Sequence, residues 1–87
     1  MKGYIALIQQ EPDGSYCAKF PDLPGLIVIS ETIGHARVEA EVALGDHVRR
    51  LEAEGETVPE PSNFERIIAE HRDALENMSV ALIGIDA

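Results

Sequence analysis

Apolar and polar positions divide the chain into three strand-like segments, two helical segments and a last strand-like segment. Residues 3–10 form the first of these, and every position from Tyr4 to Ile8 is apolar. A strand with apolar side chains on both faces is typical of the interior of a sheet. We therefore expect this strand to have neighbours on both sides.

The next two strands follow through turns. The sequence Glu11-Pro12-Asp13-Gly14 has proline in its second position and glycine in its fourth, which fits a type I turn. It leads into a return strand over residues 15–20, so the two strands predict an antiparallel hairpin. Residues 26–29 are rich in β-branched side chains and predict a third strand.

A long amphipathic helix is predicted from Thr32, a residue suited to the N-cap, to about Glu54. Gly55 is suited to end it as a C-terminal cap. Apolar residues recur at spacings of three and four, as in a helix that buries one stripe. The stripe consists of Ile33, Ala36, Ala40, Ala43, Leu44, His47, Val48 and Leu51.

A second helix is predicted to begin at Ser62, because Ser62 and Glu65 have the spacing of a capping box. It runs to about Leu75, and its apolar side consists of Phe64, Ile67, Ile68 and Leu75. Residues 79–86 predict a last strand, which can lie beside the first. The order β-β-β-α-α-β predicts a two-layer α+β fold with both helices on one face of the sheet.

The most distinctive segment, Phe20-Pro21-Asp22-Leu23-Pro24-Gly25, joins the second and third strands. Each proline fixes φ at about −65° and removes one backbone donor. Asp22 can accept hydrogen bonds from nearby backbone, and Gly25 can take a positive φ that other residues avoid. We expect a rigid, shaped loop here.

Length and composition indicate one globular domain over residues 1–87, with 45% hydrophobic and 26% charged residues. A core this small is marginally stable alone, which favours a homo-oligomer. No apolar run approaches the roughly 18 residues of a membrane helix, and no signal-peptide pattern is present, so we expect a cytoplasmic protein without membrane contact. The single cysteine, Cys17, fits a reduced structural thiol.

Four features in order resemble the HicB-type antitoxin family, and the resemblance covers residues 1–62. They are Asp13-Gly14-x-Tyr16, the corner Phe20, Pro21, Asp22, Leu23, Pro24, Gly25, the helix-opening Thr32, and Gly-x-x-Val-Pro-x-Pro from Gly55 to Pro61. The resemblance implies a truncated RNase H-like fold and binding to a HicA-type toxin, a small basic ribonuclease that cleaves mRNA. Many members carry cysteine where this chain has Leu26, a position that we expect to be buried.

The residues offer little for catalysis. Two-metal hydrolysis of a phosphodiester needs several converging carboxylates, but the first strand has none and the last offers only Asp86. His35 and His47 share a helix without the i, i+4 spacing of a metal-ligand pair, and His71 lies on the second helix. We therefore expect no enzymatic activity, no metal site and no cofactor.

The charge points to a different role. A net charge of −9 disfavours binding to nucleic-acid phosphates and favours encounter with basic proteins. Between Glu52 and Glu76, eight acidic residues stand against Arg66 and Arg72. This segment is either a solvated surface or a docking face for a basic toxin. The candidate contact residues are Asp13, Asp22, Glu60, Glu65, Glu70 and Asp73.

The expected function is that of a non-enzymatic antitoxin in a type II toxin–antitoxin pair. Members of the family usually bind operator DNA through an added C-terminal module, and the chain ends after its last strand, so we expect no DNA binding by this chain alone. Two alternatives stay open: an RNase H-like protein with residual nucleic-acid binding or nuclease activity, and a HicB-like regulatory oligomer without a toxin. A short basic reading frame beside the gene would favour the antitoxin.

Overall fold

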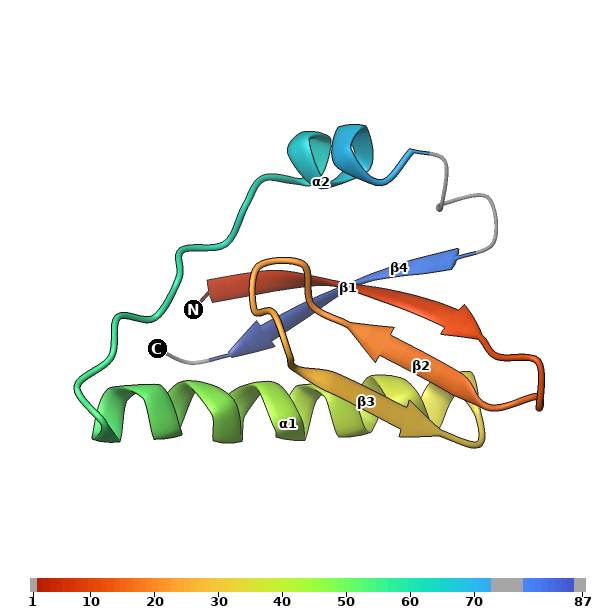
Figure 1. Cartoon of the computed structure of the whole chain (residues 1–87), viewed down its shortest axis with the longest axis horizontal. Helices are drawn as coiled ribbons and strands as arrows, with labels where there is room; N and C mark the ends of the chain where they lie inside the picture. Colours follow the sequence, from red (N-terminus) through yellow and green to blue (C-terminus); the bar gives the residue numbers. More distant parts are fainter. Residues whose placement is uncertain (1, 73–77, 86–87) are drawn as a thin grey trace.

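The computed structural model describes residues 2–72 and 78–85. Within this part of the chain, four strands and two helices follow one another in the predicted order (Figure 1). They are β1 (Lys2–Gln10), β2 (Tyr16–Lys19), β3 (Ile27–Ser30), α1 (Ile33–Ala53), α2 (Phe64–Glu70) and β4 (Met78–Ile85). The predicted α+β class is confirmed, and each strand lies within two residues of its expected bounds.

The strands form one antiparallel sheet in the order β3-β2-β1-β4. β1 is an interior strand, as its apolar residues on both faces predicted: Leu7 pairs with Lys19 of β2 and with Val80 of β4. A β-turn also forms at the predicted residues between β1 and β2, since the Gly14 amide donates to the Glu11 carbonyl at 2.9 Å. β3 and β4 are the two edges of the sheet.

Helix α1 covers one face of the sheet and builds the larger core. Thr32 caps it as predicted, because its Oγ1 accepts a hydrogen bond from the His35 amide. Gly55, with φ +74°, ends it. The buried residues between helix and sheet come from every strand and from the predicted stripe of α1. They include Tyr4, Ala6, Ile8, Ala18, Phe20, Val28, Ala40, Leu44, Val48, Ala81 and Ile83.

The second helix lies on the opposite face, so the prediction of both helices on one face is wrong (Figure 1). Ile67 of α2 packs against Ile5 and Leu7, whose side chains point away from α1. The physical reason is that β1 is apolar on both faces, and each face needs a cover. The segment between α1 and α2 wraps around one end of the sheet to provide the second cover.

The start of α2 also differs from the prediction. The N-cap is Asn63, whose side-chain oxygen accepts from the Arg66 amide at 2.7 Å, and Ser62 makes no capping box. Among the described residues of the expected apolar side, Ile67 alone is fully buried, and Phe64 is largely exposed. The helix ends at Glu70. The prediction for Leu75 lies outside the described residues.

Candidate partner interface

The proline corner consists of two consecutive turns with proline in the second position of each. The Leu23 amide donates to the Phe20 carbonyl at 3.0 Å, and the Leu26 amide donates to the Leu23 carbonyl at 3.1 Å. Gly25 has φ +90°, which is the geometry of a type II turn and confirms the predicted positive φ. Phe20 and Leu23 are buried in the main core. This part of the motif therefore shapes and anchors the loop.

A clasp joins the corner to the segment that precedes α2. The Asp22 carboxylate accepts two hydrogen bonds from Ser62, at 2.7 Å from its backbone amide and 2.5 Å from its hydroxyl. Nearby, the buried Tyr4 hydroxyl donates to the Pro59 carbonyl at 2.6 Å. Val58 packs against the main core. These contacts hold the whole extended segment between the two helices against the end of the sheet.

Only part of this arrangement can be predicted from the sequence. Asp22 was expected to bond backbone near itself, and it bonds a residue forty positions away instead. Ser62 looked like a helix cap because Ser-x-x-Glu is a common pattern at helix starts. In the structure the Ser62 hydroxyl donates to Asp22, and the neighbouring Asn63 is the N-cap of α2.

The clasped segment presents an acidic surface. We define it by six residues that are all exposed: Glu52, Glu54, Glu56, Glu60, Glu65 and Glu70. They follow the chain from the end of α1, around the sheet, onto α2 (Figure 1). Glu70 pairs with Arg66 across one helical turn at 3.0 Å. Within the described residues, the carboxylates of Glu56 and Glu65 have no partner.

The candidate contact residues do not form a single cluster. Glu60, Glu65 and Glu70 belong to the acidic surface, whereas the Asp22 carboxylate is occupied by Ser62. Asp13 lies at the turn between β1 and β2. Asp73 lies outside the described residues. Contact of these residues with a partner stays a prediction.

Asp13 is held by its own turn. Its Oδ1 accepts hydrogen bonds from the Ser15 hydroxyl at 2.6 Å and from the Ser15 amide at 2.9 Å. The Ser15 hydroxyl, and after it the Ser15 amide, lower the pKa of the Asp13 carboxyl below its ordinary value of 3.8. The side chain is fully solvent-exposed. It is thus a fixed negative charge near neutral pH.

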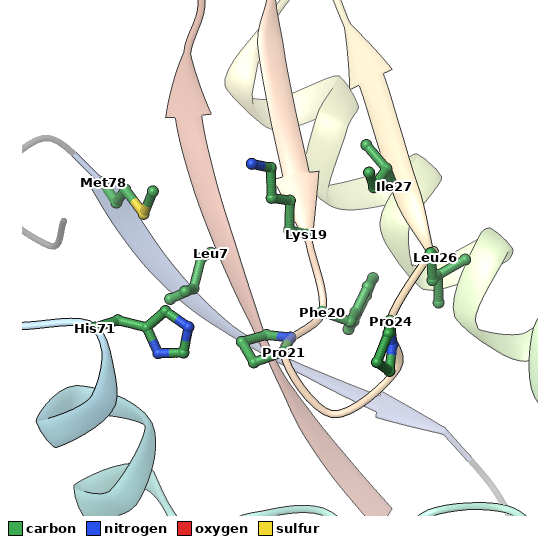
Figure 2. Close-up of a pocket in the computed structure, with 10 residues that line it drawn as sticks. Leu7, Lys19, Phe20, Pro21, Pro24, Leu26, Ile27, His71 and Met78 are labelled. Atoms are coloured by element: carbon green, nitrogen blue, oxygen red, sulfur yellow. The ribbon is translucent and has the colours of Figure 1, made fainter.

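An apolar cleft of about 310 Å³ lies on the α2 side of the sheet (Figure 2). Pro21 and Pro24 of the corner form one wall, and Leu7 and Met78 of the sheet line it as well. Figure 2 shows the ring of His71 turned toward Pro21. The His71 Nδ1 is 3.0 Å from the Ile67 carbonyl, which can only accept, so this nitrogen carries the proton. The cleft has the size and lining to hold an apolar side chain.

The histidines and the cysteine have ordinary surroundings. His47 Nδ1 accepts from Arg50 at 3.2 Å, and His35 pairs with Glu39 on the surface of α1. Cys17 is a buried free thiol. A search of residues 2–72 and 78–85 gives no group of three His, Cys, Asp or Glu side chains arranged to hold a metal ion. In the same residues, neither helix is long and apolar enough to cross a membrane.

Comparison with solved structures places this geometry among known antitoxins. The N-terminal domain of Burkholderia pseudomallei antitoxin HicB is 27% identical with a TM-score of 0.84, and the match covers 98% of this chain and 99% of that domain. A structure of the B. pseudomallei antitoxin HicB is 26% identical, with a TM-score of 0.85. This chain spans 64% of its length, matching over 99% of its own residues.

A complex of HicA3 and HicB3 also contains a similar chain. It is 27% identical with a TM-score of 0.76, over 98% of this chain and 99% of that chain. Comparison with curated proteins gave no match. The family model described as the HicB-like antitoxin of bacterial toxin–antitoxin systems matches residues 4–87. The chain therefore belongs to the HicB-like antitoxin family, as the motifs around the proline corner predicted.

Proposed function

We propose that this chain is the antitoxin of a type II pair and that it works by covering a small basic HicA-type ribonuclease. The observation that carries the proposal is the acidic surface, whose exposed carboxylates follow the chain from the end of α1, through the clasped segment, onto α2. Carboxylates can replace phosphates on an RNA-binding face. Because the segment is held in place, the partner does not have to order it on binding.

The apolar cleft supports the same proposal. Stable interfaces combine a central pocket that takes an apolar anchor with a polar, charged rim. Here the cleft adjoins the C-terminal end of α2 through His71, and Glu70 of the acidic surface is the preceding residue. A toxin side chain in the cleft would supply affinity, and the carboxylates would supply orientation and a fast encounter.

Neutralisation by covering requires no chemistry from the antitoxin, and we propose that the chain is not an enzyme. The family resemblance implies a truncated RNase H-like fold. The strand order β3-β2-β1-β4, in which β1 is an interior strand, supports this fold. A nuclease of this kind needs carboxylates on its central strands. Neither β1 nor β4 carries an acidic residue. The nuclease alternative is therefore the weaker one. We further propose a cytoplasmic homo-oligomer that binds its toxin without binding DNA itself.

Co-expression tests the proposal. The chain is produced together with the protein encoded beside it, and the mixture is analysed by size-exclusion chromatography and by an mRNA cleavage assay. We expect one complex in which cleavage is suppressed. A neighbouring protein that elutes separately and cleaves mRNA at an undiminished rate would refute the proposal.

Charge reversal locates the contact. The double variant Glu56→Lys with Glu65→Lys changes two unpaired carboxylates of the acidic surface, and its control, Glu31→Lys with Glu41→Lys, makes the same charge change at other exposed sites. We expect the first variant to weaken suppression of cleavage and the control to leave it close to wild type. Glu31 lies beside the Asp13 turn, so a larger loss in the control would move the contact there.

A further inference from the structure

One edge of the sheet carries an apolar surface that the acidic surface does not include. We define the β3 edge by Ile27 and Ile29 of β3 and by Val38 and Val42 of α1. Their exposed fractions are 52%, 66%, 59% and 60%. The valines are one helical turn apart, and together with the strand they line a shallow groove along the side of β3. Exposed apolar residues that gather in this way mark interaction sites more often than scattered ones do.

The strand itself has little protection against pairing. β3 lies at the end of the sheet, and its sequence, Ile27-Val28-Ile29-Ser30, contains no charged residue and no proline. Edge strands usually carry such residues because a bare edge pairs with other chains. The β4 strand also contains no charged residue or proline, and Arg37 of α1 lies beside it, as Glu39 and Asp46 lie beside β3. The β3 edge differs in that its four apolar residues are each more than half exposed.

The charges beside the groove point to an uncharged occupant. Glu39 accepts a hydrogen bond from the Ser30 hydroxyl at 2.8 Å and pairs with His35 at 3.2 Å. Asp46 pairs with Arg49 on the same helix. The two carboxylates that line the groove are therefore engaged within the chain. A basic toxin can therefore pair with Glu56 and Glu65 of the acidic surface, whereas the β3 edge offers it apolar side chains.

We propose that the β3 edge binds the same edge of a second copy of this chain, which joins the two sheets into one. This proposal rests on the homo-oligomer proposed above and identifies the surface through which it forms. It does not depend on the toxin. A twofold axis perpendicular to the sheet brings β3 beside β3 of the partner subunit in antiparallel orientation. It also places both α1 helices on the same face, where Val38 and Val42 of each meet across the axis.

The register follows from the faces of the strand. Side chains opposite each other in an antiparallel pair lie on the same face, so a strand that pairs with itself must be centred on a residue. Centring on Val28 sets Ile27 against Ile29 of the partner subunit twice. Centring on Ile29 would instead set Ile27 against the charged Glu31 of the partner subunit. The structure therefore favours the register centred on Val28.

A dimer through this edge would bury both backbone and apolar side chains. The edge supplies the backbone of a strand, four half-exposed apolar side chains and the adjoining flank of α1. A chain of 87 residues buries a small core, so this added burial is a substantial part of its stability.

Light scattering at tens of micromolar tests the surface. We expect twice the monomer mass of 9.5 kDa for the wild type and 9.5 kDa for Ile29→Lys and for Val42→Lys. Leu82→Lys, a matched change at an exposed apolar residue of the β4 edge, should remain dimeric. A monomeric wild type would overturn the proposal together with self-association. A dimer that survives Ile29→Lys and Val42→Lys but not Leu82→Lys would overturn this surface alone.

Disulfide trapping tests the register in a Cys17→Ser background. Residues directly opposite in an antiparallel pair have Cα atoms about 4.5–5.5 Å apart, within the range of a disulfide, whereas diagonal neighbours are about 7–8 Å apart. Val28→Cys should therefore form a covalent dimer under mild oxidation, and Ile29→Cys should form much less. The reverse result would reject the register. Ile29→Lys should still bind the toxin. If the wild type is a monomer and Ile29→Lys no longer binds the toxin, the β3 edge is a toxin-binding surface instead.

Discussion

The clasp between Asp22 and Ser62 can be tested by removing one partner at a time. Asp22→Ala deletes the carboxylate that accepts from the Ser62 amide at 2.7 Å and from its hydroxyl at 2.5 Å. Both donors are half-buried, so they regain only part of their hydration when the acceptor is lost. The segment between the helices then keeps Tyr4 and Val58 as its attachments.

The magnitude follows from the two hydrogen bonds. A hydrogen bond to a charged group is worth about 1.5–3 kcal/mol when buried, and this site is half-buried. We expect Asp22→Ala to lower the free energy of unfolding by about 2 kcal/mol. For a domain of this size, 1 kcal/mol corresponds to roughly 4–8 °C in Tm. A fall of about 8–16 °C is therefore expected in thermal unfolding followed by circular dichroism.

A double-mutant cycle separates the clasp from other effects of losing a charge. Ser62→Ala removes only the hydroxyl bond and should cost about 1 kcal/mol. Once Asp22 is replaced by alanine, Ser62→Ala should cost almost nothing further, because the bond is already gone. The reasoning is refuted if the two losses add fully, or if Asp22→Ala costs less than about 0.5 kcal/mol, as an ordinary surface substitution does.

Three further changes probe the loops and the helix. Gly25→Val should cost about 1–3 kcal/mol because φ is +90° there, although a Cβ would meet no atom within 4 Å, and Leu26→Cys should cost less; equal melting temperatures would contradict this. Gly45→Ala should stabilise α1 by about 0.5–1 kcal/mol, measured by urea unfolding, since the new Cβ meets only the end of the Arg49 side chain, at 3.4 Å. In an NMR titration, Asp13 should have a pKa below 3.8, and Ser15→Ala should bring it closer to 3.8; because the folded pKa is lowered, the stabilising contribution of this turn is present above about pH 4 and is lost as pH falls through the folded pKa.

Local patterns predicted most of the fold. Features that depend only on neighbouring residues can be predicted from the sequence. Examples are the cap at Thr32, the glycine at position 55 and the proline turns. The placement of α2 depends on a long-range fact, namely which face of the sheet still needs cover. Ile5 and Leu7 contained that information, because a strand that is apolar on both faces must be covered twice.

The candidate site was less predictable. The excess of carboxylates after Glu52 is a property of composition and survives in the structure as an exposed surface. The clasp joins residues forty positions apart, and two short polar side chains carry no pattern that pairs them. The β3 edge was visible only as a strongly apolar strand; that Ile27 and Ile29 are exposed depends on the sheet order, which leaves β3 at the end.

The central claim, that an acidic surface covers a basic toxin, is tested most directly by the rate at which the chain associates with a HicA-type toxin as salt is varied. Exposed charges are screened beyond about 8 Å at physiological ionic strength, so a steered encounter slows as salt rises. We expect the rate constant to fall about tenfold or more between low and high salt, and Glu65→Lys to flatten this dependence while Glu41→Lys leaves it close to wild type. A rate that does not change with salt, or that responds equally to the two substitutions, would contradict the account.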